Sequence, residues 1–182
     1  MTSLLMRLFV HDLSGYQPRI VDLEEPISIV GISTDTTLKG IYRDVARLGR
    51  QFKDLKEANP IPNKREPWGF AAVSRGYDPK TGAMTYIVGD MVTEANEVPE
   101  GMQVFMIPAL KYAIFPVRPK GRLGWGLAIA NAKGYAYTQW LPRSPYEPAG
   151  VIDDFEYHDE RSTRKRKPEI DLYVAIRPRG SK

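Results

Sequence analysis

The chain has 182 residues with 42% hydrophobic and 26% charged side chains and a formal net charge of +4, which suits one soluble domain with a buried core. No apolar run approaches the ~18 residues that a membrane-spanning helix needs, so we expect no membrane partner. The absence of cysteine excludes disulfides, thiolate metal sites and cysteine nucleophiles. His11 and His158 are too few for a zinc site built mainly from histidines. We therefore expect a cytoplasmic protein with no metal and no other cofactor.

The amino-terminal residues 1–18 are apolar at first, but they contain Arg7 and no small-residue cleavage site follows them. We expect no signal peptide and interpret residues 1–18 as an extension to which the sequence assigns no role.

The first half of the chain reads as strand, strand, helix, strand, strand. Pro26 separates two extended stretches, because proline cannot donate to a strand ladder. A stripe of apolar residues at helical spacing runs from Ile41 to Leu55, with Thr36 or Thr37 as the expected N-cap. The predicted elements are strands at 19–23 and 25–32, a helix from 41 that stops before Asn59-Pro60, and strands at 69–75 and 84–89.

The second half repeats this order. Pro108 takes the place of Pro26, and a second apolar stripe runs from Trp125 to Trp140, ending at Leu141-Pro142. The predicted elements are strands at 102–106 and 107–114, a helix at 125–140, and strands at 154–158 and 169–176. A basic run at 161–167 lies between the last two strands, and we interpret it as a solvated hairpin loop. Nothing resembles a DNA-reading module, so we expect no direct nucleic-acid binding.

The repeat predicts an α+β fold in which two halves, 19–92 and 102–178, form one domain over residues 19–182. A half of this size buries little surface alone. We expect the halves to pair into one curved antiparallel sheet with both helices on one face, and a ligand cleft on the other face at the pseudo-twofold axis.

Glu156 is the sharpest candidate for a binding residue. Strand alternation places its side chain on the face opposite Phe155 and Tyr157. If that face is the cleft, an unpaired carboxylate lies among aromatic rings, and such a group favours a lipophilic cation. Spacing alone equally fits an exposed strand glutamate.

Aromatic residues close the second helix in the segment Trp140-Leu141-Pro142-Arg143-Ser144-Pro145-Tyr146-Glu147. Pro142 and Pro145 stiffen this exit, and that stiffness would direct Tyr146 over the cleft. The alternative is an ordinary proline-rich loop.

These segments, with Asp154-Phe155-Glu156-Tyr157, resemble the GyrI-like small-molecule-binding family, also called AraC-type effector-binding domains. The resemblance covers about residues 19–177. Further matches are Val30-Gly31-Ile32, Ile61-Pro62-Asn63, Tyr86-Ile87-Val88-Gly89, Val98-Pro99-Glu100-Gly101 and Glu169-Ile170-Asp171-Leu172.

The resemblance implies a bacterial, stand-alone effector- or multidrug-binding domain of the kind that senses drugs in transcription regulators. It implies that Glu156 lies at the base of the ligand pocket and meets cationic ligands. By position the other ligand-binding candidates are Tyr112, Trp140, Tyr146, Trp68 and Glu169. The sequence departs from the family where Gly49 follows Leu48 and where Pro145 stands between Ser144 and Tyr146.

Three functions fit these residues and the resemblance. The first is a protein that binds a lipophilic or cationic small molecule and sequesters it or reports it to a regulatory protein partner. The second, implied by hydrolase relatives that open cyclopropane rings of DNA-alkylating compounds, uses Glu156 as a catalytic general base with help from Tyr146. The third is a protein–protein inhibitor of gyrase type, for which the sequence offers little support.

Overall fold

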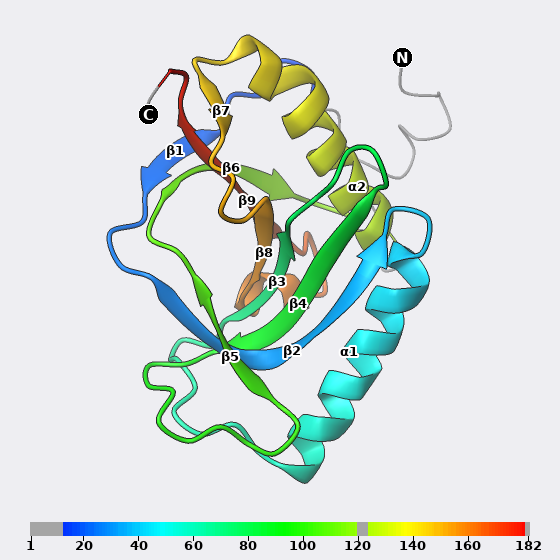
Figure 1. The fold of residues 1–182 in the computed structure, drawn as a ribbon, viewed down its shortest axis with the longest axis vertical. Helices are drawn as coiled ribbons and strands as arrows, with labels where there is room; N and C mark the ends of the chain where they lie inside the picture. The colour runs from blue at the N-terminus through cyan, green and yellow to red at the C-terminus, as the bar shows by residue number, and fades with distance from the viewer. Residues whose placement is uncertain (1–12, 120–123, 181–182) are drawn as a thin grey trace.

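The computed structural model describes residues 13–119 and 124–180, which form one antiparallel sheet and two main helices (Figure 1). The strands are β1 (Arg19–Asp22), β2 (Ile27–Thr37), β3 (Phe70–Arg75), β4 (Ala83–Met91), β5 (Gln103–Ile107), β6 (Lys111–Val117), β7 (Tyr146–Pro148), β8 (Asp154–His158) and β9 (Ile170–Pro178). The helices are α1 (Ile41–Ala58) and α2 (Trp125–Tyr135), and α2 continues through a π-helical turn (Ala136–Trp140) into a 3-10 turn (Leu141–Arg143).

The strand order confirms the predicted duplication. The sheet runs β1-β6-β9-β8-β3-β4-β2-β5, with β7 added to β9. β8 and β3 meet at the centre, and the first strand of each half pairs with the second strand of the other half, as β1 with β6 and β5 with β2. This exchange of first strands ties the two halves into one curved sheet.

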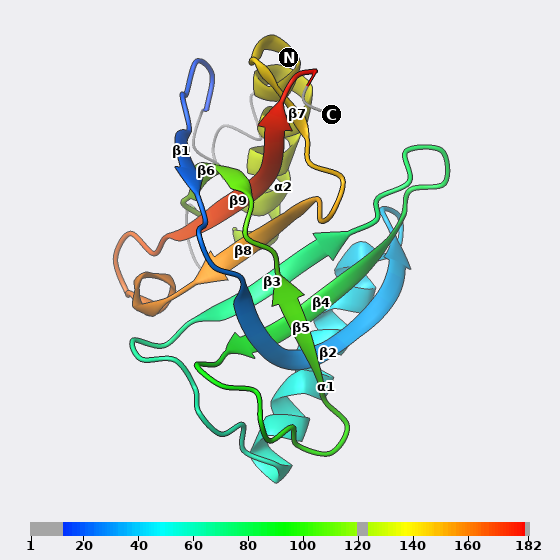
Figure 2. The same ribbon diagram turned by 60° about the vertical axis from the view of Figure 1, so that its left-hand side comes forward.

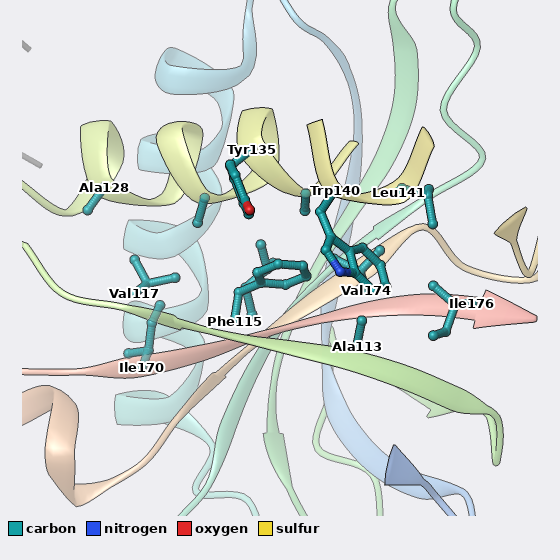
Figure 3. Packing of buried hydrophobic residues seen from close by; sticks show 13 residues of the cluster. Ala113, Phe115, Val117, Ala128, Tyr135, Trp140, Leu141, Ile170, Val174 and Ile176 are labelled. Atoms are coloured by element: carbon teal, nitrogen blue, oxygen red, sulfur yellow. The ribbon is translucent and has the colours of Figure 1, made fainter. Parts of the chain in front are cut away.

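Both helices cover the same face of the sheet (Figure 2). The register aligns one row of side chains across the central strands: Val88, Ala72, Glu156, Leu172 and Phe115. Val88 packs in a cluster with Leu48 and Phe52 of α1, whereas Leu172 and Phe115 pack in a cluster under α2. In the α2 cluster, Tyr135 and Trp140 point from the helical segment toward the sheet around Phe115 (Figure 3). Glu156 therefore lies in the same row as the two hydrophobic clusters and between them.

The other face of the sheet carries a third hydrophobic cluster. Phe155, Tyr112 and Ile107 are buried in it, and Tyr157 and Tyr173 pack against it partly exposed. Phe155 and Tyr173 stack with ring centroids 4.5 Å apart. Several of the aromatic residues in the sequence therefore serve to pack this face of the sheet.

Helix α1 follows the predicted apolar stripe, with Leu48 and Phe52 buried, and ends at Ala58 before Asn59-Pro60. The expected N-cap is wrong. Thr36 and Thr37 belong to β2, and Gly40 precedes the helix without a side-chain cap. Thr36 instead donates its hydroxyl to Asp44 in the first turn, at 2.8 Å.

The basic run connects β8 to β9, as predicted for a hairpin. Arg161 departs from the solvated interpretation, because its guanidinium binds Asp159, Glu169 and Asp171 at 2.8–3.2 Å. Tertiary contacts between β8, β9 and the loop thus hold one of the run's arginines in place.

Candidate functional site

Glu156 lies on the helix-covered face of the sheet, with 4% of its surface exposed. We predicted a ligand cleft on the face opposite the helices, with Glu156 in that cleft. The structure instead places Glu156 on the helix-covered face. The reason is the register: Glu156 aligns with Ala72 and Leu172, and both of these residues face the helices. The exposed-glutamate alternative is also wrong, because the carboxylate is buried beneath the helical layer.

Two carboxylates and one lysine meet at this position, and we call Lys133, Asp154 and Glu156 the charged centre. Lys133 extends from α2, and its Nζ lies 2.8 Å from Asp154 Oδ1 and 3.3 Å from Glu156 Oε1. The same Nζ donates to Ser74 Oγ at 3.0 Å. Strand alternation brings the two carboxylates to one face, since Asp154 and Glu156 are two residues apart on β8.

Tyrosine hydroxyls donate a hydrogen bond to each carboxylate of the charged centre. Tyr86 on β4 donates to Glu156 Oε1 at 3.1 Å, and Tyr137 donates to Asp154 Oδ2 at 3.0 Å. His158 Nε2 lies 3.5 Å from Glu156 Oε2. Buried carboxylates need such partners, because an unpaired ion away from water is destabilising by several kcal/mol.

These contacts decide the charge of each group. Burial acts to raise the pKa of Glu156, but Lys133, His158 and Tyr86 outweigh it and hold this pKa below its usual value of 4.5. Burial acts to lower the pKa of Lys133, but Asp154 and Glu156 outweigh it and raise this pKa above 10.5. Burial and the Glu156 carboxylate raise the pKa of Tyr86 well above 10.0, so its hydroxyl keeps the proton that it donates. At neutral pH the lysine and Glu156 are therefore ionised.

Aromatic rings lie beside the charged centre and the neighbouring His158, although they are not the rings that we predicted. Tyr86 presents its face to Lys133, with Nζ 5.8 Å from the ring centroid. Phe70 and Trp125 flank His158, with centroid distances of 5.3 and 6.3 Å. The site thus combines negative charge with aromatic surface, the two features that recognise organic cations.

Tyr112 lies on the face of the sheet opposite Glu156. It aligns with Ala175 on β9, whereas Glu156 aligns with Leu172, and these two partners are three positions apart along the strand, so they face opposite sides of the sheet. The Tyr112 ring is fully buried and its hydroxyl donates to the Pro108 carbonyl at 2.8 Å. The prediction that Tyr112 and Glu156 line the same pocket is therefore wrong.

Trp140 and Tyr146 line a separate pocket of about 310 Å³ at the end of the α2 segment. Their rings stack with centroids 6.2 Å apart. Residues 15–20 form another wall of this pocket, so part of the amino-terminal extension packs against the second half. Tyr146 pairs with Pro178 on β9, six residues along from Leu172, which places it about 20 Å along the sheet from Glu156. The structure therefore does not bring Tyr146 to Glu156 as a catalytic pair.

Neither Glu169 nor Trp68 is one of the three residues of the charged centre. Glu169 binds Arg118 and Arg161 just before β9, which satisfies its charge locally. Trp68 is half-buried directly before β3, near the strand end where Phe70 aligns with His158. Of the six predicted residues, Glu156 alone belongs to the charged centre.

Comparison with known proteins places this geometry in a family. The model of Cass2, described as an integron-associated effector binding protein, matches residues 19–176. The chain belongs to this Cass2 effector-binding family.

One curated relative of this Cass2-family chain is a transcriptional regulator. The chain is 39% identical over 161 residues to the transcriptional regulator BrlR of Pseudomonas aeruginosa, and the match covers 85% of the chain but 54% of the regulator. The chain thus spans about half the length of this curated relative.

Solved structures share the Cass2-family fold at low identity. An integron cassette protein from Vibrio cholerae matches with a TM-score of 0.60 and 15% identity, covering 89% of this chain and 97% of that one. SAV2435, solved bound to tetraphenylphosphonium, matches with a TM-score of 0.62 and 13% identity, covering 88% and 94%. EcmrR, solved in a complex with DNA, matches with a TM-score of 0.61 and 11% identity, covering 89% and 57%.

Sequence reasoning missed Lys133 and passed over Asp154 and Tyr86, although signals for them exist. Asp154 lies two residues before Glu156 in a strand, which fixes it to the same face. Lys133 lies four residues after Ile129 and four before Tyr137, on a stripe beside the core-facing stripe of α2. Only the fold reveals that this stripe passes over β8.

Within residues 13–119 and 124–180, no cluster of three or more acidic or histidine side chains is arranged to hold a metal ion. In the same ranges, no helix has the length and apolar character that crossing a membrane requires.

Proposed function

We propose that this chain binds a lipophilic organic cation between α1 and α2, with the charged centre at the base of the site. The observation that carries the proposal is the imbalance of buried charge. Asp154 and Glu156 are 3% and 4% exposed, and both meet a single lysine, Lys133, so the buried acidic side chains outnumber the lysine. An organic cation would supply the further positive charge.

The surrounding rings support an organic cation over an inorganic one. The carboxylates accept hydrogen bonds from Tyr86 and Tyr137. The rings of Phe70 and Trp125 contact His158, the neighbour of Glu156 on β8. Each aromatic face that meets a cation contributes about 0.5–2 kcal/mol. Membership of an effector-binding family supports a small-molecule ligand, and the tetraphenylphosphonium complex of SAV2435 supports this ligand class. The similarity to the transcriptional regulator BrlR supports a role in which ligand binding is signalled to a regulatory protein partner.

The test is calorimetric titration with tetraphenylphosphonium and with tetraphenylborate, which has the same shape and the opposite charge. We expect the phosphonium to bind and the borate not to bind. Glu156→Gln and Asp154→Asn should each weaken phosphonium binding about tenfold or more, because each removes a buried charge that the cation meets.

Glu57→Gln is the matched control, since Glu57 is an exposed residue on α1 whose side chain is 66% accessible. Equal affinity for both ions, or full phosphonium affinity in Glu156→Gln, would contradict a cation site at the charged centre.

A further inference from the structure

Lys133 occupies the position that the proposed ligand cation needs. Its ammonium group contacts Asp154 at 2.8 Å, Glu156 at 3.3 Å and the Ser74 hydroxyl at 3.0 Å. It also lies over the Tyr86 ring, at 5.8 Å from the centroid. These are the contacts of an organic cation in an acidic, aromatic site, made here by a side chain of the protein itself.

The position of Lys133 in the fold allows it to leave. Its side chain is 21% exposed, so part of the side chain already lies at the protein surface while the ammonium group contacts the acids. The four-carbon stem is flexible and the ammonium ion is strongly hydrated, so its release into solvent restores favourable hydration. The next residue, Gly134, is exposed, with no atom within 4 Å of where a Cβ would stand. The helix changes to π-helical geometry shortly afterwards, at Ala136.

We infer that Lys133 is an internal competitor that the effector must displace from Asp154 and Glu156, and that it sets the selectivity of the site. This inference rests on the proposed function. A tethered ammonium group reaches the carboxylates at an effective concentration far above that of free small cations. Sodium, potassium and small ammonium ions gain only the ion pair and do not displace it. A lipophilic cation also gains aromatic contact, which gives it the advantage that displacement requires.

The first experiment compares wild type, Lys133→Met and Lys53→Met by calorimetry at pH 8, where Glu156 stays ionised because its pKa lies below 4.5. Methionine keeps the stem volume and removes the charge. We expect Lys133→Met to bind tetraphenylphosphonium about tenfold tighter or more than wild type, and to gain binding of tetramethylammonium that wild type lacks. Lys53→Met removes an exposed lysine of α1, with 72% of its side chain accessible, and should match wild type.

The second experiment uses wild type, so it does not depend on a variant that folds. Lysines are reductively methylated with and without saturating tetraphenylphosphonium and mapped by mass spectrometry. We expect Lys133 to be protected in the free protein, because Nζ is held by three acceptors, and to become reactive in the complex. Lys53 should react equally in both samples.

The outcomes separate the two proposals. If wild type binds the phosphonium while a folded Lys133→Met binds it no tighter, or if Lys133 stays protected in the complex, the competitor role is overturned and the cation site stands. If neither wild type nor folded Lys133→Met binds the phosphonium, the proposed function fails and the competitor role fails with it.

Discussion

At the scale of single residues, the buried carboxylate of Glu156 depends on groups from two other elements and from its own strand. Lys133 reaches it from α2 and Tyr86 from β4, while His158 is two residues along β8. The local sequence Asp154-Phe155-Glu156-Tyr157 determines that the two acids share a face and the two rings share the other. It does not indicate which cationic side chain forms ion pairs with the two acids.

Tyr86→Phe tests whether the hydroxyl holds Glu156. The change removes the 3.1 Å hydrogen bond and leaves a buried carboxylate oxygen with one donor fewer. We expect a loss of about 1–3 kcal/mol in the free energy of unfolding, measured by urea denaturation. Tyr42→Phe, at a ring that is 64% exposed, should change it by less than about 0.5 kcal/mol. Equal stability of the two variants would contradict the importance of this hydrogen bond.

At the scale of elements, β2 is positioned by a close approach of two backbones. Gly31 of β2 aligns with Gly89 of β4. A Cβ at Gly31 would lie 1.8 Å from the Val88 carbonyl oxygen, a distance that no side chain can occupy. The repeat in the sequence aligns Gly31 with Ala113, and so gives no sign that glycine is required at this position.

Gly31→Ala should therefore destabilise the sheet strongly. The methyl group meets backbone, which cannot rotate away, so we expect a loss of about 3 kcal/mol or more in the free energy of unfolding. Gly49→Ala is the opposite case, because Gly49 lies within α1 with no atom within 4 Å of a Cβ. It should gain about 0.5–1 kcal/mol. Thermal unfolding followed by circular dichroism measures both, and a Gly31→Ala protein as stable as wild type would refute the close contact.

At the scale of the whole molecule, the two halves place a polar site where their hydrophobic clusters end. β3 and β8 are the central strands, one from each half, and the α1 and α2 clusters flank them. Ser74, Asp154 and Glu156 occupy the helix-facing positions of these two strands, and Lys133 of α2 contacts all three. A ligand site at the junction of two similar halves is a common outcome of duplication.

This arrangement predicts acid sensitivity. Glu156 has a pKa below 4.5 in the folded protein, so the unfolded chain binds its proton more readily and stability is lost as the pH falls from about 4.5 through the folded pKa. Asp44 and Asp159 contribute with the same sign, because hydrogen bonds from Thr36 to Asp44 and from Arg161 to Asp159 lower their pKa values. Asp153 opposes them, because burial raises its pKa.

Urea midpoints measured between pH 3 and 7 should fall at the acidic end for wild type and fall less steeply for Glu156→Gln. A Glu156→Gln profile parallel to that of wild type would show that this carboxyl does not contribute to the slope.

Local patterns in the sequence were enough to predict the main helices, the strands other than β7, and the duplication, because hydrophobic periodicity, prolines and short motifs are properties of neighbouring residues. The two apolar stripes predicted α1 and α2, and Pro26 and Pro108 predicted the breaks between strands. Which face of the sheet carries Glu156, and which residues meet it, depended on the folded chain. The helix that crosses a strand and the register that pairs Tyr112 with Ala175 are set by packing between distant segments, which no local pattern encodes. For that reason Lys133, which neutralises one of the two carboxylates, emerged only from the fold.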